Sequence, residues 1–156
     1  CVQCMPDLRK ADAAYLPQAK QVRETHVYLP VDFLSKTNLA AFYGKVAQRG
    51  GKFWEFRQRL LDLKDPNPNA YFDALVAVGL APADIRRWMI TANRRFYREL
   101  DADAMLSKAI ALSKPPHFFV NGIHVGDGGI PRELLGDVLA YQINYNRYNL
   151  GSLGHD

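Results

Sequence analysis

The feature that most constrains the fold of this chain is a pair of short apolar runs joined by Asn121-Gly122. The runs lie within "PPHFFVNGIHVG", residues 115–126. An Asn-Gly pair between such runs is the strongest local signal for a β-hairpin, because a type I′ turn requires a positive φ at both positions. We therefore expect two short antiparallel strands here, in a chain whose other patterns are mainly helical.

Helical patterns occupy most of the remaining chain. "MPDLRKADAAYLPQ" is expected to form a helix that ends near Pro17, and Val22–Leu29 a strand that Pro30 stops. The other expected helices are, in chain order, "KTNLAAFYGKVAQRGG", "KFWEFRQRLLDL", "AYFDALVAVGL", the arginine-rich "DIRRWMITANRRFYREL", "DADAMLSKAIALS" and, after the hairpin, "IPRELLGDVLAYQINY". This order of elements predicts an α/β fold.

The size and composition of the chain suit one domain with its own core, since 48% of its 156 residues are hydrophobic. No apolar run approaches the roughly 18 residues of a membrane-spanning helix. The sequence as given contains no signal peptide. We therefore expect no stable insertion into a membrane.

The positive charge of the chain is mild, at +4, and much of it lies in the arginine-rich segment. This segment is expected to form one amphipathic helix, with Arg87, Arg94 and Arg98 on one face. The opposite face carries Ile85, Met89, Ala92, Phe96 and Leu100. A solvated helix face is the favoured interpretation and a nucleic-acid surface the alternative, because no recognition motif accompanies the arginines. We expect no nucleic-acid partner.

The two cysteines of the chain, Cys1 and Cys4, lie in "CVQC" directly before the first expected helix. A disulfide-stapled scaffold would need more cysteines, a zinc ribbon a second pair, and haem attachment a histidine where Met5 stands. A helix N-terminus stabilises a thiolate, and two thiols at this spacing can form a reversible disulfide. Val2 and Gln3 carry no charge, so we do not expect the strongest thiolate stabilisation. The pair alone leaves a redox centre, half of a metal site and a chance pair open.

Four parts of the sequence together resemble the DsbA-like family of thiol-disulfide oxidoreductases: "CVQC", "GGKFWEFRQRLLD", "KPPHFFVNG" and the closing helix. The resemblance runs from Cys1 to about Tyr145. It implies a thioredoxin-like fold at residues 1–146, interrupted by an all-helical insertion at about residues 35–112. Residues 147–156 are then a C-terminal tail.

By position, the resemblance implies that Cys1 is the nucleophile, Cys4 the resolving cysteine and Pro116 the cis-proline beside them. The neighbouring residues expected to contact the substrate are Val2, Gln3, Pro115 and His117. The implied activity is dithiol-disulfide exchange with cysteines of exported proteins, as an oxidase, isomerase or reductase. It implies a redox partner protein, no cofactor, no metal, and a periplasmic or other extracytoplasmic location in bacteria.

The chain departs from the family pattern at two prolines. Pro115 stands where the family usually has Thr or Val, which removes a backbone donor that would pair with a bound peptide. Pro6 follows Cys4 so closely that a late or distorted start of the first helix is expected.

Three histidines lie in or beside the expected strands: His26, His117 and His124. His117 could share a proton with Cys1 or stabilise its thiolate, or it could be a half-exposed residue at a strand end. His26 and His124 are expected in strands, and no partner can be named for either from the sequence. No functional role is therefore predicted for these two.

The resemblance also implies a central strand directly before Cys1, which the sequence does not contain. We expect a fragment that lacks roughly 25–40 upstream residues with an export signal. The rival interpretation is a lipoprotein acylated at Cys1. Two alternatives to the redox function remain: a redox-silent interaction module, and a metal-binding module using Cys1, Cys4 and His117. The latter set falls short of the four ligands that zinc normally takes.

Overall fold

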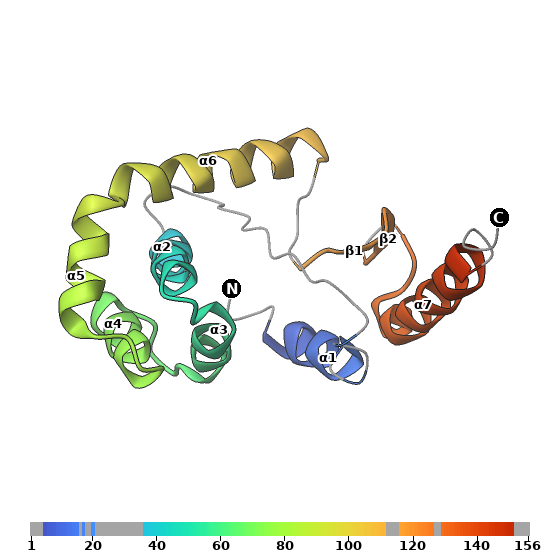
Figure 1. Ribbon diagram of the computed structural model, residues 1–156, viewed down its shortest axis with the longest axis horizontal. Coiled ribbons are helices and arrows are strands. Elements are labelled where there is room, and N and C mark those ends of the chain that lie inside the picture. The colour runs from blue at the N-terminus through green and yellow to red at the C-terminus, as the bar shows by residue number, and fades with distance from the viewer. Residues whose placement is uncertain are drawn as a thin grey trace. The chain divides into compact units, whose positions relative to one another are not determined.

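The computed structural model describes residues 5–15, 17, 20, 36–111, 116–126 and 129–151. The chain divides into two compact units. The hairpin unit comprises Cys1–His26 and Leu112–Asp156, and the helical unit comprises Val27–Ala111. The described residues form seven α-helices and one two-stranded antiparallel sheet, in agreement with the expected mixture of helices and a hairpin (Figure 1).

The helical unit is built from five helices: α2 (Lys36–Arg49), α3 (Phe53–Asp62), α4 (Pro68–Ala77), α5 (Pro82–Thr91) and α6 (Asn93–Ala109). Their ends follow local chemistry. The Asn67 side chain caps α4 by accepting a hydrogen bond from the Ala70 backbone N–H at 3.0 Å. Gly51 and Gly79, just beyond α2 and α4, have φ of +68° and +93°, the left-handed conformation that commonly ends helices.

Helix α2 lies at the centre of the helical unit, with residues 41–47 buried without a break. It packs against α3, α4, α5 and α6. Phe42 meets Phe96 of α6 edge to face, with ring centroids 5.7 Å apart. The core of the unit is completed by Val46, Phe56, Tyr71, Leu75, Leu80, Ile85 and Leu100. An apolar helix surrounded in this way accounts for the separate core of the helical unit.

The arginine-rich segment is two helices, which corrects the expectation of one. Helix α5 ends at Thr91 and α6 begins at Asn93, around Ala92 with φ −106° and ψ 3°. Thr91 is β-branched, and its Oγ1 donates a 2.8 Å hydrogen bond to the Arg87 carbonyl, an interaction that bends helices. The separate helix expected from Asp101 is also wrong, because α6 continues to Ala109. Leu100 and Ser107 are both buried, so α6 packs along its length without a break.

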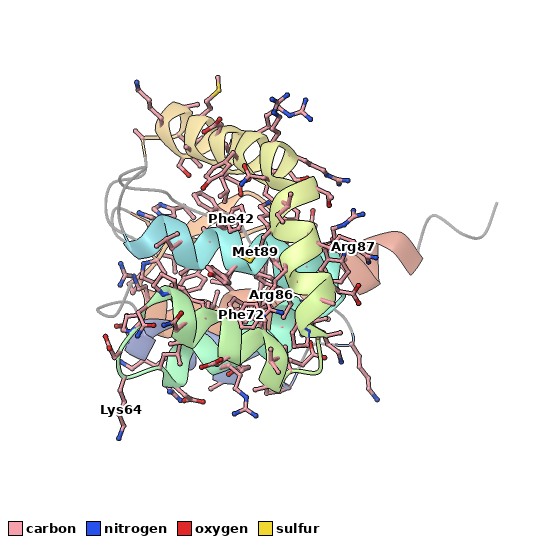
Figure 2. All side chains as sticks on the ribbon, turned by 90° about the vertical axis from the view of Figure 1, so that its left-hand side faces the viewer. Phe42, Lys64, Phe72, Arg86, Arg87 and Met89 are labelled. Atoms are coloured by element: carbon pink, nitrogen blue, oxygen red, sulfur yellow. The ribbon has the colours of Figure 1, made fainter. Side chains whose placement is uncertain are left out.

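The predicted division of this segment into a polar and an apolar face is nevertheless confirmed. Four of the five apolar residues are buried and Met89 is half-buried. The five arginines are exposed. Several have partners within the unit: Arg87 lies 2.7 Å from Asp84, and Arg86 lies over the ring of Phe72 (Figure 2). The arginines therefore form a solvated helix surface, which is the interpretation that the sequence favoured.

The described part of the hairpin unit comprises α1 (Met5–Tyr15), β1 (Phe118–Val120), β2 (Ile123–Val125), the 3-10 helix η3 (Arg132–Leu134) and α7 (Leu135–Gly151). Asn121 and Gly122 have φ of 49° and 84°, which confirms the predicted turn. The Asn121 side chain donates a 3.0 Å hydrogen bond to Gln142 of α7. This bond ties the tip of the hairpin to the closing helix.

A small core joins the hairpin to both helices of its unit. Phe118, Val120 and Val125 point to one side of the hairpin, where they meet Ala11 of α1 and Leu139 of α7. Sheet residues alternate between faces, so His117, Phe119 and His124 belong to the other side. The hairpin thus has a core face and a second face that carries His117, Phe119 and His124.

Helix α1 begins at Met5, so the expected late start after Pro6 is wrong. Proline is tolerated in a first helical turn, where backbone N–H groups have no partner within the helix. The strand predicted at Val22–Leu29 lies outside the described residues. No helix in the described ranges is both long and apolar enough to cross a bilayer.

Candidate functional site

The predicted redox residues fall partly within the described chain. Cys1, Val2, Gln3, Cys4 and Pro115 lie outside it, so their geometry and the conformation of the Pro115-Pro116 bond are not described. The remaining two predicted residues are described. Pro116 is buried and His117 is half-buried, directly before β1. Both belong to the same compact unit as α1, the helix that follows the cysteine pair.

A contact between two histidines is the most distinctive polar feature of the hairpin unit. His117 Nδ1 and His124 Nε2 are 3.0 Å apart, with ring centroids at 5.2 Å. The ring of Phe119 stacks on that of His124, with centroids 4.9 Å apart and an interplanar angle of 18°. His124 thus lies in a strand, as expected, and it has a partner that could not be named from the sequence.

The register of the hairpin is the sequence signal for this contact. A two-residue turn at Asn121-Gly122 pairs Phe119 with His124, which is the register found. His117 is two residues before Phe119 and on the same face, hence a diagonal neighbour of His124. Diagonal neighbours on one face of a hairpin lie within reach of aromatic side chains.

The loop after β2 folds back against His124 and uses two glycines. A Cβ on Gly126 would lie 3.6 Å from both His124 Nε2 and Arg132 Nε, and 4.0 Å from the Pro116 carbonyl oxygen. A Cβ on Gly129 would lie only 2.5 Å from the His124 carbonyl oxygen. The same oxygen accepts a 3.1 Å hydrogen bond from the Ile130 N–H. The backbone of His124 is thus held by a loop that leaves no room for a side chain at Gly129.

A hollow of about 310 Å³ lies on the core side of the hairpin. Its walls come from α1, β1, η3 and the start of α7: Lys10, Ala11, Ala14, Phe118, Arg132, Glu133 and Leu135. The small side chains of Ala11 and Ala14 leave this hollow open. The side chains of Lys10, Arg132 and Glu133 border it. Across the described ranges, no group of three or more His, Cys, Asp or Glu side chains converges as a metal site would require.

The helical unit contains an ionic cluster that the sequence analysis missed. Lys45 Nζ of α2 lies 3.4 Å from Glu99 Oε2 and 3.6 Å from Asp103 Oδ2, both on α6. The Lys45 side chain is only 10% exposed. Arg95 Nε adds a 2.7 Å hydrogen bond to Glu99 Oε1. The local sequence carries one hint, a lysine within an otherwise apolar helical stretch.

The charges of this cluster argue for a structural role. Burial alone raises the pKa of Glu99, but the hydrogen bond from Arg95 and the nearby charge of Lys45 together hold that pKa below its ordinary value. The Lys45 amine lies within ion-pair distance of two carboxylates on another helix, an arrangement that suits a structural contact. We therefore interpret the cluster as a link between α2 and α6.

The candidate site accordingly centres on the hairpin unit: the helix after the cysteine pair, buried Pro116, the His117–His124 contact and the glycine loop behind it. Comparison of the chain with protein-family models, with curated proteins and with solved structures finds no match.

Proposed function

We propose that this chain is a thiol-disulfide oxidoreductase with a DsbA-like variant of the thioredoxin fold. The observation that supports this most is the division of the chain. Residues 1–26 and 112–156 form one unit, although a separate helical unit lies between them in the sequence. An interrupted thioredoxin domain requires such an arrangement. The hairpin that follows Pro116, and its packing with α1 and α7, also suit it.

In the proposed mechanism the dithiol carries the electrons. The Cys1 thiolate attacks one sulfur of a substrate disulfide, forms a mixed disulfide and releases one substrate thiolate. Cys4 then attacks Cys1 Sγ and releases the second substrate thiolate. The Cys1-Cys4 disulfide remains, and two electrons have passed to the substrate. The reverse sequence oxidises a substrate dithiol. Neither direction requires a cofactor.

The residues around the dithiol would bind the extended segment that contains the substrate cysteine. Val2, Gln3, Pro115 and His117 are proposed to contact it, with Pro116 as the cis-proline beside the sulfurs. The proposed substrates are exported proteins in a periplasmic or other extracytoplasmic compartment. A second redox protein restores the dithiol or the disulfide after each turnover.

The test uses the full chain and two single variants. After mild oxidation, wild-type protein should resist alkylation at both cysteines, and reduction should restore both thiols. With glutathione disulfide, Cys4→Ser should accumulate a stable mixed disulfide at Cys1, because no resolving thiol remains. Cys1→Ser is the matched control and should accumulate far less. Two alkylatable thiols after oxidation, or equal adduct formation in both variants, would refute the proposed function.

A second candidate, a metal-binding module, gains one donor from the structure. His124 lies beside His117, so two cysteines and two histidines would supply the four ligands that zinc prefers. Two observations weigh against it: the imidazole nitrogens already face each other, and Arg132 adds a positive charge near His124. Zinc analysis after dialysis separates the candidates. One zinc per chain that protects both thiols from alkylation favours the metal site. A zinc-free protein with a reversible disulfide favours the oxidoreductase. A zinc-free protein that exchanges no disulfides favours a redox-silent module.

A further inference from the structure

The exposed side of helix α6 changes from basic to apolar along its length. Its first half carries three arginines, Arg94, Arg95 and Arg98. In its second half, Met105 is 72% exposed and Leu106 is 49% exposed. Ala102 and Ala109 are also exposed, and helical spacing places them on the same side as these two side chains. Single exposed apolar residues are common on protein surfaces, whereas a contiguous exposed patch marks an interaction surface.

The four apolar residues have the spacing found in helices that pack in pairs. Ala102 and Ala109 are seven residues apart, and Met105 and Leu106 lie midway between them. Small residues at this spacing let two helix axes approach closely, while the larger side chains fill the space on either side of the contact. The order of the residues, small, large, large, small, is the same in both chain directions. The face is therefore complementary to an antiparallel copy of itself.

We infer that this face of α6, formed by Ala102, Met105, Leu106 and Ala109, is the contact through which two copies of the chain form a dimer. The two α6 helices run antiparallel, and the two-fold axis passes between Met105 and Leu106. Ala102 of each copy lies opposite Ala109 of the other, and the two Leu106 side chains meet near the axis. Such a contact uses the same surface on both copies, so association stops at two. The inference is independent of the proposed redox function.

Two charged residues beside this face favour a second copy as the partner. Asp101 and Lys108 lie on the same edge of the apolar face, again seven residues apart. Among the described residues neither side chain forms an ion pair, and Asp101 Oδ1 accepts no hydrogen bond. Within one chain the two residues are about 10 Å apart along the helix, too far for a direct ion pair. In the antiparallel dimer, Asp101 of each copy lies within one helical turn of Lys108 of the other, so two ion pairs can form.

The length of the contact sets its strength. From Ala102 to Ala109 the face covers about 10 Å of helix. A contact of this length buries less than the roughly 800 Å² per partner of a standard stable interface. We therefore expect a weak dimer, with a dissociation constant on the order of 100 µM. The chain should be monomeric in dilute solution and dimeric in concentrated solution.

The first experiment measures the mass of the full chain by sedimentation equilibrium, below and above the expected dissociation constant, with reductant present so that no disulfide links two chains. Wild type should change from monomer to dimer as its concentration rises. Met105→Glu places a charge at the centre of the contact and should stay monomeric. Ile90→Glu is the matched control, because Ile90 of α5 is 78% exposed and lies outside this face; it should dimerise like wild type. A monomeric wild type at every concentration, as when another part of the same chain covers the face, or equal effects of the two variants, would overturn the inference.

The second experiment tests the charged edge. Lys108→Glu makes this edge wholly acidic and Asp101→Lys makes it wholly basic, so each variant alone should dimerise about tenfold more weakly than wild type. An equimolar mixture of the two variants should form heterodimers at about the wild-type affinity, because each acidic edge then faces a basic one. A mixture that associates no better than the separate variants would contradict the proposed orientation.

A third measurement needs no change at the charged edge. In a chain with Cys1 and Cys4 replaced by serine, Leu106→Cys should form a disulfide between two chains on mild oxidation, because the two copies of this side chain meet near the axis. Ile90→Cys in the same background is the control and should form far less. Equal cross-linking of the two variants would count against α6 as the dimer contact.

Discussion

Replacing Gly129 with alanine should destabilise the hairpin unit, and the amount follows from the structure. The added methyl group would lie 2.5 Å from the His124 carbonyl oxygen and 3.1 Å from its Nδ1. A carbon and an oxygen normally approach no closer than about 3.4 Å, so the loop must move by almost 1 Å. The shift removes the hydrogen bond from Ile130 to the same oxygen, about 1 kcal/mol, and adds roughly 1–3 kcal/mol of packing strain. We expect a total loss of about 2–4 kcal/mol.

Gly136→Ala serves as the matched control, and its expected effect on the stability of the hairpin unit has the opposite sign. A Cβ at this position would meet only the Ala14 Cβ at 3.7 Å, an ordinary van der Waals contact between α7 and α1. Alanine also favours the helical conformation over glycine by up to about 1 kcal/mol. Gly136→Ala should therefore leave the stability of the unit unchanged or raise it by about 0.5–1 kcal/mol.

The assay must report on the right unit. Both tryptophans, Trp54 and Trp88, lie in the helical unit, so tryptophan fluorescence excited at its long-wavelength edge follows that unit. Hydrogen exchange at amides of α7, with circular dichroism in urea, reports on the hairpin unit. Gly129→Ala should increase exchange in α7 and leave the fluorescence transition unchanged. Equal protection of α7 in wild type and Gly129→Ala, or a loss in Gly136→Ala as large as in Gly129→Ala, would refute the reasoning.

Two further predictions concern the ionic cluster of the helical unit. Lys45→Met should lower the stability of the helical unit by about 1–2 kcal/mol, because Glu99 and Asp103 lose their shared cation while both remain partly solvated. A urea transition, detected by tryptophan fluorescence, at the wild-type midpoint would contradict this. The pKa of Glu99 is lowered on folding from its ordinary 4.5, so its contribution to stability is present above about pH 4.5 and is lost as the pH falls through the folded pKa. Glu99→Gln should therefore flatten the dependence of the urea midpoint on pH between about 5 and 3, whereas a curve parallel to wild type would exclude the effect.

Local sequence signals predicted the hairpin and most helices because each depends on a few adjacent residues. Asn121-Gly122 sets its own turn, and Gly79 ends α4 without help from distant parts of the chain. The break at Ala92 was missed because the apolar stripe continues through it: Ile85 and Phe96 are both buried although they lie on different helices. An amphipathic pattern records which side is buried, not whether the helix axis is continuous.

The ionic cluster joins residues that are distant in sequence, and the contact between the two histidines depends on the register of the hairpin. Nothing near Lys45 indicates that its partners lie more than 50 residues later on α6. A single strand gives no partner for His124, whereas the register set by the turn places it near His117. The roles of Cys1 and Cys4 came from a family resemblance and remain predictions.

The split composition of the hairpin unit has a consequence for biosynthesis. Helix α1 ends at Tyr15 and α7 begins at Leu135, yet the two pack against each other. On the ribosome, α1 emerges first and must wait for its partner, while the intervening helices already have every contact of their own core. Closing so long a loop is slow compared with local helix packing. Helix α1 is therefore without its partner throughout translation of the helical unit, and it can pack only after α7 has been made.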